Sequence, residues 1–372
     1  MNNITLVLLG AGNSTRFGLK AKKQWLYIGD DPLWYFVTKQ FKSYGFKETI
    51  IVSSFQEIEY MKKFDTFTFV EGGETRQESL KNALKNVSTK YVLVSDIARC
   101  CINHDMIKRI LENREKADCI VPALNISDTL YMDNSPANRE SAKLIQTPQL
   151  SETKLLLKAI QSDEVFTDDS SAMHKSGNKI LFVEGSQNAH KLTFADDLKK
   201  LTCLKPPSQK TFVGFGIDTH PFEQNKPMYL CGEMIENSFG FKAHSDGDVA
   251  IHAIIDAILG AAGLGDIGEF FPDTDNRYKN IDSKELLKIC VDRINTYGFD
   301  INNVDITILA EIPKISPHKE KMRQTLSKIL GINQRSVNIK ATTSEKLGFV
   351  GRCEGISVHA IATLNYFNWT KL

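Results

Sequence analysis

HSDGDVAIHAIIDAILGAAGLGDIG, residues 244–268, combines the apolar stripe of a buried helix with a set of acidic and imidazole side chains. Apolar residues recur at the helical period, from Ile251 through Ile254 and Ile255 to Ile258, which predicts a helix packed in a core. Ser245 or Asp246 is expected to cap its start. The stripe does not require the polar residues, so these need a separate explanation; they are His244, Asp246, Asp248, His252, Asp256 and Asp266.

The composition of the whole chain narrows the class of protein. A length of 372 residues favours two domains, and a net charge of +1 gives no bulk electrostatic case for binding nucleic acid. No segment approaches the ~20 apolar residues of a membrane span, and the apolar run 4–9 lacks the basic flank of a signal peptide. Seven cysteines without a CxxC pair predict a reduced, cytoplasmic protein.

Strand-like and helix-like segments alternate along the first half. The expected strands are 4–9, 49–54, 66–72, 91–96 and 118–124, the expected helices are 33–45 and 76–87, and a short helix follows within 194–205. This order predicts a Rossmann-like α/β domain with a mostly parallel sheet and its ligand at the carboxyl ends of the strands. A Pro-rich linker at about 203–210 precedes a new strand at 211. The expected domains are therefore 1–210 and 211–372.

A glycine-containing loop follows the first strand. Gly10 and Gly12 free the backbone to approach an anion, and Arg16 and Lys23 follow downstream. The spacing is neither that of a dinucleotide-binding loop nor that of a Walker A loop. On its own, this pattern also fits a plain turn followed by solvated lysines.

Longer motifs narrow the possible functions of the first half of the chain. The runs GAGNSTRF, GGETRQESL (72–80), VLVSDIARCCI (92–102), IQTPQL (145–150) and TDDSSA (167–172) resemble the 2-C-methyl-D-erythritol 4-phosphate cytidylyltransferase family over residues 1–200. The resemblance implies that the acceptor phosphate attacks the α-phosphorus of CTP and that pyrophosphate leaves.

The same resemblance assigns roles to individual residues. Arg16 and Lys23 would stabilise the transition state, Asp96 would hold Mg²⁺ or Mn²⁺, and Ser79 beside the Gly72–Gly73 turn would read cytosine. The remaining implied substrate contacts are Gly10, Ala11, Gly12, Gly73, Thr129, Arg139, Thr147 and Lys191.

Some positions depart from this family's pattern. Ser14 replaces a loop glycine, Ser95 replaces a histidine, Ile97 replaces an alanine and Cys100 replaces a proline. Two alternatives therefore stay open for the first half: a cytidylyltransferase for another polyol phosphate, or a nucleotide-binding scaffold without catalysis.

The second half carries a candidate metal site. Asp218 and His220 lie two residues apart on an expected strand and so point to one face, and His252 lies on the helix that follows. One carboxylate and two imidazoles suit a zinc ion with one position left for substrate. Asp256, one helical turn after His252, is expected to orient the imidazole. A histidine satisfied within the core is the alternative.

The second half also resembles a known family over residues 212–365. The motifs GFGIDTH (214–220), residues 244–268, DIGEFFPDTD (266–275), AEIPKISPH (310–318) and KATTSEKLGFVGRCEGI (340–356) resemble 2-C-methyl-D-erythritol 2,4-cyclodiphosphate synthase, an α/β domain of trimeric type. The implied reaction closes an eight-membered ring from a diphosphocytidyl substrate and releases CMP.

This second resemblance also implies roles. Asp218, His220 and His252 would bind Zn²⁺, Glu345 would bind a second ion, Mg²⁺ or Mn²⁺, and His244 and Thr343 would contact the transition state. The implied substrate contacts are Asp218, His220, Ser245, Asp266, Ile267, Gly268, Phe271, Asp273, Ala310, Lys314, Thr342, Glu345, Phe349 and Arg352.

Together the two resemblances predict a bifunctional enzyme of the non-mevalonate route to isoprenoid precursors, acting on small molecules and not on nucleic acid or membranes. A trimeric synthase fused to a dimeric transferase predicts a homo-oligomer, a hexamer. No kinase glycine-rich loop is present, so the kinase of the intermediate step is a candidate partner. Unchanged sedimentation of the chain with that kinase would argue against such contact.

Overall fold

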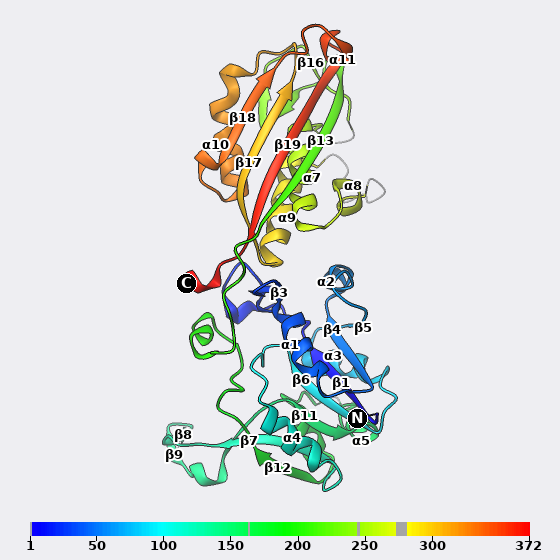
Figure 1. Ribbon diagram of the computed structural model, residues 1–372, viewed down its shortest axis with the longest axis vertical. Helices are drawn as coiled ribbons and strands as arrows, with labels where there is room; N and C mark the ends of the chain where they lie inside the picture. The colour runs from blue at the N-terminus through cyan, green and yellow to red at the C-terminus, as the bar shows by residue number, and fades with distance from the viewer. Residues whose placement is uncertain (1, 163, 244–245, 273–280) are drawn as a thin grey trace. The chain divides into compact units, whose positions relative to one another are not determined.

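The computed structural model describes residues 2–162, 164–243, 246–272 and 281–372. The chain forms two compact units, Met1–Pro206 and Pro207–Leu372, each described by itself below (Figure 1). Among the described residues, no helix is long and apolar enough to cross a membrane.

The first unit is built on an eight-stranded sheet in the order β10-β7-β11-β6-β1-β4-β5, with β12 paired to β7. The strands are β1 (Ile4–Leu9), β4 (Glu48–Ser53), β5 (Thr68–Glu71), β6 (Tyr91–Asp96), β7 (Cys119–Asn125), β10 (Lys143–Ile145), β11 (Gln149–Glu152) and β12 (Ile180–Glu184). β1 runs parallel to β4 and β6, whereas β10 and β11 are antiparallel to their neighbours. The mostly parallel sheet and its five expected strands are confirmed.

Helices and short hairpins complete this unit. The helices are α1 (Leu33–Lys42), α2 (Phe55–Met61), α3 (Arg76–Leu84), α4 (His104–Glu112), α5 (Thr153–Ala159) and α6 (Asp169–Lys175). The short strands are β2 (Tyr27–Ile28), β3 (Asp31–Pro32), β8 (Leu130–Met132) and β9 (Ser135–Ala137). The short helix expected within 194–205 is a 3-10 helix over Ala195–Lys200. Val7, Val52 and Val94 are fully buried in the core under the sheet.

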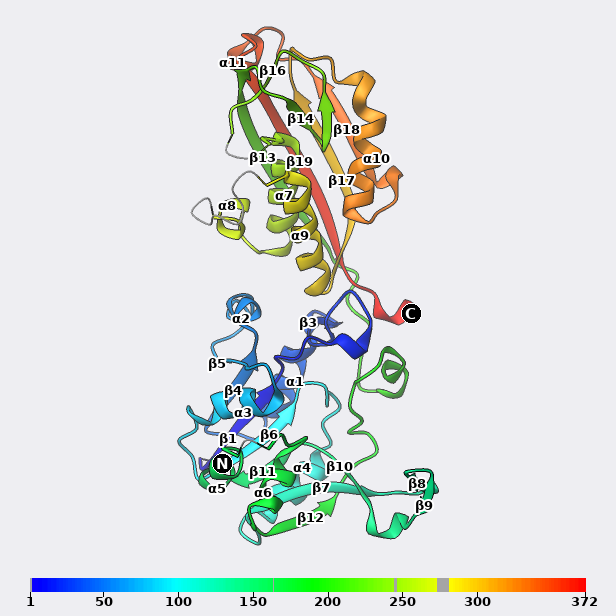
Figure 2. The ribbon, with the colours of Figure 1, turned by 180° about the vertical axis from the view of Figure 1, so that it is seen from behind.

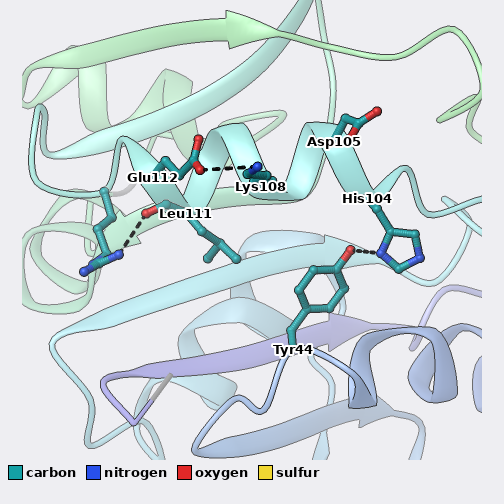
Figure 3. A pocket seen from close by; sticks show the side chains of 7 residues that line it. Tyr44, His104, Asp105, Lys108, Leu111 and Glu112 are labelled. Atoms are coloured by element: carbon teal, nitrogen blue, oxygen red, sulfur yellow. Dashed lines mark hydrogen bonds and ion pairs between the residues drawn. The ribbon is translucent and has the colours of Figure 1, made fainter.

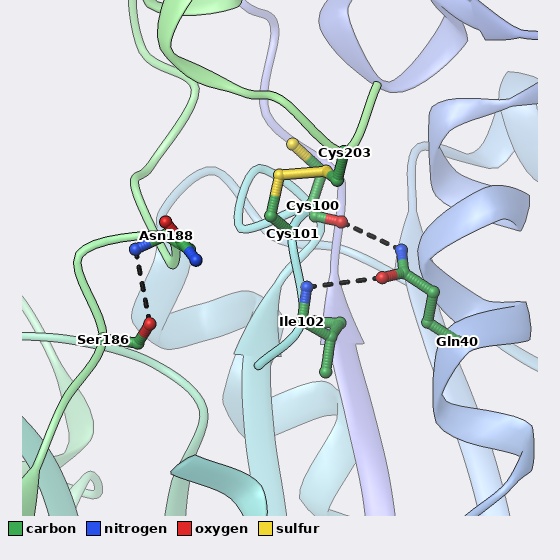
Figure 4. The surroundings of a disulfide bond; sticks show 7 residues. All are labelled: Gln40, Cys100, Cys101, Ile102, Ser186, Asn188 and Cys203. Carbon is green, nitrogen blue, oxygen red and sulfur yellow. Dashed lines mark hydrogen bonds between the residues drawn. A yellow bond between two sulfur atoms is a disulfide. The ribbon is translucent and has the colours of Figure 1, made fainter. Parts of the chain in front are cut away.

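A disulfide joins Cys101 to Cys203, 102 positions apart in the sequence (Figure 4). The expectation that every cysteine is reduced is therefore wrong for this pair. Spacing along the chain could not reveal the pair, because folding brings the two Cα atoms to 5.6 Å. Gln40 secures the same loop, since its side chain bonds the carbonyl of Cys100 and the amide of Ile102.

The second unit has a five-stranded sheet in the order β16-β13-β19-β17-β18. The strands of this sheet are β13 (Thr211–Gln224), β16 (Phe239–Phe241), β17 (Phe299–Leu309), β18 (Val337–Thr342) and β19 (Gly355–Tyr366), and β14 (Met228–Leu230) pairs with β15 (Glu233–Ile235) in a separate two-stranded sheet. Its helices are α7 (Val249–Ala262), α8 (Ile267–Phe270), α9 (Ser283–Thr296), α10 (Lys319–Leu330) and α11 (Gly348–Gly351). Helix α7 packs across β13 and β19, so the expected core helix is confirmed (Figure 2).

The two faces of β13 differ in character. A side chain at Gly214 or Gly216 would place its Cβ within 2.0 Å of a carbonyl oxygen of α7, so only glycine allows the helix to lie this close. Val213, Phe215 and Ile217 alternate with the glycines on the other face and are 65%, 59% and 51% exposed. The strand thus carries a helix-packing face and an exposed apolar face.

Candidate active sites

The first unit has a cavity of about 350 Å³ at the carboxyl ends of β1 and β6. The first-unit site residues expected from the sequence that line it are Gly10, Ala11, Gly12, Arg16, Lys23, Gly73, Ser79, Asp96 and Lys191. Strand pairing explains part of this convergence, because Leu9 lies level with Asp96 in the sheet. The cavity is therefore where a parallel sheet is expected to bind its ligand.

The loop after β1 wraps the cavity closely. The amide of Gly10 donates to the carbonyl of Val52 at 2.8 Å. Ser14 has a φ of 55°, in the left-handed region that favours glycine. Its hydroxyl donates to Gln24 Oε1 at 3.1 Å and accepts from the amide of Lys23 at 3.3 Å. The serine at this position therefore holds the loop and Lys23 together.

Cations surround one carboxylate in the cavity. Lys191 Nζ lies 2.6 Å from Asp96 Oδ2. Burial would raise the pKa of Asp96, but the charges of Arg76 and Lys191 outweigh it and lower the pKa to about 2. Burial and the neighbouring Lys191 and Arg16 lower the pKa of Lys23. The site therefore concentrates positive charge around an ionised aspartate, which suits a triphosphate and a divalent ion.

Arg76 lines the cavity and pairs with the buried Asp169, and neither residue was singled out from the sequence. Arg76 Nε lies 3.3 Å from Asp96, and its Nη1 lies 2.7 Å from Asp169. Arg76 is placed by the capping box of Thr75 and Glu78, which starts α3 at the rim of the cavity. The capping box in TRQE was a usable signal for this arginine, whereas nothing local pointed to Asp169.

Three expected substrate contacts do not line this cavity. Arg139 lies beyond the β8–β9 hairpin and donates to the carbonyl of Ser127, and Thr129 directly precedes that hairpin. Thr147 is buried, and its hydroxyl accepts from Arg99 Nε at 3.2 Å. Within one chain, Lys191 therefore lines the cavity, whereas Thr129, Arg139 and Thr147 do not.

A second hollow, of about 400 Å³, lies beside α4 (Figure 3). Polar side chains in its lining interact with one another: Tyr44 forms a hydrogen bond with His104, and Lys108 forms an ion pair with Glu112. Burial raises the pKa of Tyr44 to about 12. None of the site residues expected from the sequence lines it.

The second unit brings together the predicted metal ligands. Ligand atoms of Asp218, His220 and His252 all lie within 4.8 Å of one another. Asp218 Oδ2 is 3.0 Å from His220 Nε2 and 3.2 Å from His252 Nδ1. Burial opposes ionisation of Asp218, but the two neighbouring histidines outweigh it and lower the pKa of this carboxyl. A half-buried carboxylate facing two imidazole nitrogens is a donor set that fits zinc.

The acidic residues around α7 act differently from expectation. The N-cap is Asp248, not Ser245 or Asp246; its buried carboxylate accepts from the amides of Ala250 and Ile251. The same carboxylate also accepts from the amides of Cys231 and Gly232. These two bonds join segments distant in the sequence, so local sequence could not reveal them.

Asp256 does not orient His252, contrary to expectation. Its carboxylate accepts from the amide of Ile267 at 2.8 Å and so anchors the start of α8. Ser283 approaches His252 instead, with Oγ 3.1 Å from Nε2. Helical spacing placed Asp256 on the correct face, but the chain folds back and satisfies its carboxylate with backbone.

The other expected synthase residues form two groups. Asp266, Ile267 and Gly268 lie at the start of α8, with Phe271 after it, next to α7. The second group lies after β17 and at and after the end of β18, and it comprises Ala310, Lys314, Thr342, Thr343, Glu345, Phe349 and Arg352. His244, Ser245 and Asp273 lie outside the described residues.

The distance between the metal ligands and this second group follows from a row of paired residues that crosses the sheet from β13 to β18. Thr219 pairs with Ser357, Ser357 with Leu309, and Leu309 with Thr342. Three steps of about 4.8 Å each separate the two ends of the row by roughly 14 Å. The second group therefore lies level with the metal ligands but across the sheet.

Known families match both units. Residues 4–203 match the 2-C-methyl-D-erythritol 4-phosphate cytidylyltransferase family, and residues 211–365 match the YgbB family. The cavity, the metal ligands and these matches define a two-domain enzyme that joins a cytidylyltransferase to a cyclodiphosphate synthase.

Full-length relatives share this arrangement. The chain is 59% identical over 372 residues to a bifunctional enzyme IspD/IspF of Sulfurovum sp. and 55% identical to that of Campylobacter concisus, with all of each chain covered. The solved structure of bifunctional IspDF from Campylobacter jejuni, 50% identical, matches 99% of this chain and 100% of its own with a TM-score of 0.93. The chain belongs to the bifunctional IspD/IspF family.

Proposed function

We propose that the two reactions of this bifunctional enzyme run in separate domains, 1–210 and 211–372. The first domain transfers CMP from CTP to 2-C-methyl-D-erythritol 4-phosphate and releases pyrophosphate. The convergence of Arg16, Lys23 and Lys191 around Asp96 is the observation that carries this assignment.

In the transferase cavity, each side chain has a charge-based role. The amides of Ala11 and Gly12 face the phosphates, and Arg16 and Lys23 stabilise the charge that develops on the α-phosphate. Asp96 is ionised and holds Mg²⁺ or Mn²⁺, which supplies charge neutralisation for the leaving pyrophosphate. Ser79, whose hydroxyl lies 3.1 Å from the amide of Gly73, forms the cytosine side.

In the synthase domain, Asp218, His220 and His252 hold Zn²⁺, and Glu345 holds a second divalent ion. Bound divalent metal reduces the repulsion between the two phosphates that must meet. His220 Nδ1 donates to the carbonyl of Gly247 at 2.8 Å, which leaves Nε2 to face the metal. Asp266 and its neighbours contact the ribose, and the turn 310–314 contacts cytosine.

We propose that a neighbouring copy completes the synthase site. The zinc ligands and Glu345 would contact one diphosphate. Within one chain, however, Asp218 and His220 lie on β13 and His252 on α7, whereas Glu345 follows β18, across the sheet from β13. The exposed apolar face of β13, with Phe215 at its centre and Ile361 beside it on β19, supports a trimer that brings these groups together from different chains.

The transferase domain has a surface suited to a second kind of contact between copies, a homodimer. The β8–β9 hairpin presents Tyr131 and Met132 at 62% and 67% exposure, and Arg139 and Thr129 flank it away from the cavity. A homodimer in which this hairpin reaches a second copy would bring Arg139 to the acceptor phosphate. Dimer and trimer contacts together give a hexamer.

Mixed oligomers test the shared synthase site. Asp218→Ala and Glu345→Ala are each expected to abolish release of CMP by the synthase. When the two inactive variants are unfolded and refolded together, a shared site restores about a quarter to a third of the activity, because some interfaces then receive both intact groups. Refolded single variants are the control, and absence of restored activity would contradict the shared site.

The alternatives for the first domain make different predictions. A transferase for another polyol phosphate would release pyrophosphate fastest with that acceptor in a panel, whereas a scaffold would bind CTP without pyrophosphate release. The proposed function requires release that depends on 2-C-methyl-D-erythritol 4-phosphate and is lost in Lys23→Ala. We also propose a cytoplasmic location, because CTP is a cytoplasmic metabolite.

A further inference from the structure

The hydroxyl of Ser283 lies directly behind the metal-ligand histidine of α7. His252 Nδ1 faces Asp218 Oδ2 at 3.2 Å, while Nε2, on the other side of the ring, lies 3.1 Å from Ser283 Oγ. Ser283 is fully buried at the first position of α9. The ring of His252 is therefore held between a ligand cluster and a side chain that takes no part in it.

A second contact fixes the direction of this hydrogen bond. Ser283 Oγ donates to Asp246 Oδ1, and the amide of Ser283 donates to Asp246 Oδ2 at 3.1 Å. Because the hydroxyl proton is committed to the carboxylate, the oxygen can offer only a lone pair to the imidazole. Nε2 of His252 must then carry the ring proton, which leaves the lone pair on Nδ1, toward Asp218 and His220.

We propose that Ser283 is a positioning residue for metal binding: with Asp246 behind it, it fixes the tautomer and orientation of His252. The proposal rests on the proposed metal site. His220 receives the equivalent support from a backbone carbonyl, that of Gly247. Such partners of metal-bound histidines typically change metal affinity by about 10–100-fold when removed.

The test is a zinc titration of the purified full-length chain, stripped of metal and competed against a chromophoric chelator. Ser283→Ala should raise the zinc dissociation constant by about tenfold or more, and Ser283→Thr, which keeps the hydroxyl, should restore it. Ser327→Ala is the matched control, since Ser327 is also a buried serine of this unit but bonds the carbonyl of Gln324 on α10.

Asp246→Asn provides a second route to the same result. An amide offers one acceptor where the carboxylate offers two, so one of the two bonds from Ser283 is lost and zinc affinity should fall without truncating Ser283. Equal zinc affinity of Ser283→Ala and the unchanged chain would overturn the proposal. Failure of Thr to rescue would also overturn it, because the loss would then reflect packing.

The two proposals fail differently. If the unchanged chain binds no zinc, the proposed metal site is wrong. If the unchanged chain binds zinc and Asp218→Ala does not, the site stands, and the Ser283 variants alone decide the positioning role. Urea unfolding of each variant, compared with the unchanged chain and with Ser327→Ala, reports whether the second domain is intact.

Discussion

Lys191 donates to the carboxylate of Asp96 at 2.6 Å, although 95 positions separate the two residues in the sequence. The segment of Lys191 is held against the loop after β6 by the bond from the amide of Leu192 to the carbonyl of Ala98. The acidic centre of the transferase cavity and its cation are therefore contributed by two segments that meet only in the folded domain.

Replacement of Lys191 by methionine should lower kcat/KM for pyrophosphate release by about 100-fold, since a half-buried charge lining the cavity is lost. CMP release by the synthase domain of the same protein should stay unchanged and serves as the control. A drop of less than about threefold would mean that Lys191 neutralises Asp96 without acting on substrate.

The transferase should lose activity at alkaline pH below the ordinary lysine range. Burial and two neighbouring cations lower the pKa of Lys23 from 10.5, and the charged form is the one expected to act, so activity is present below the lowered pKa and lost as pH rises through it. Lys23→Arg should move this limb upward, because a guanidinium stays protonated. Lys22→Arg, which alters a lysine paired with Glu57, should leave the limb in place.

An alanine at Gly216 should weaken both folding and metal binding of the synthase domain. Its Cβ would lie 2.0 Å from the carbonyl of Ala253, so α7, which carries His252, must shift, at a cost of about 1–3 kcal/mol. Gly260→Ala, in the same helix with open space around it, should stabilise by about 0.5–1 kcal/mol. Urea unfolding and hydrogen exchange of the α7 amides measure the stability of the two variants. Equal changes in stability for Gly216→Ala and Gly260→Ala would contradict the close-packing argument.

Removing the disulfide should destabilise the transferase domain. Because the bond closes a segment of 102 positions, Cys101→Ser combined with Cys203→Ser should lower the free energy of unfolding by about 2–5 kcal/mol. Cys353→Ser, at an exposed free cysteine, is the control. Alkylation of Cys101 and Cys203 in unfolded, unreduced protein would show instead that the bond does not form.

A charge on the exposed face of β13 should disrupt assembly without unfolding the domain. Phe215→Asp is expected to reduce the sedimentation coefficient and to abolish CMP release while pyrophosphate release persists. Met234→Asp, at an equally exposed apolar residue on β15, should leave assembly intact. Normal assembly of Phe215→Asp would contradict the proposed trimer face.

Periodicity and motif order predicted much of the fold. The strand 91–96 and the core helix of Ile251 to Ile258 were predictable because burial imposes a regular apolar pattern on each. The cluster of Asp218, His220 and His252 was predictable because two-residue spacing fixes a face of a strand. Each of these predictions depends on short-range geometry.

What could not be predicted depends on long-range contacts. Asp248 caps α7 and also accepts from two distant amides, whereas the local sequence pointed to Ser245 or Asp246 as the cap. Ser14 looked like a departure from a glycine position, yet its left-handed backbone keeps the loop shape that glycine favours. Residues that only folding unites, such as Cys101 and Cys203, leave no signal in spacing.

Inward-facing and outward-facing side chains alternate along β13, so the two faces of this strand are constrained by different contacts. Even-numbered positions from Gly214 to His220 serve helix contact and the proposed metal site, whereas the odd positions of Val213, Phe215 and Ile217 face outward. Side chains on the outer face can therefore change the contact with a neighbouring copy without moving Asp218 and His220 within their own chain. A one-residue deletion between Gly216 and Asp218 would exchange the two faces and destroy both at once.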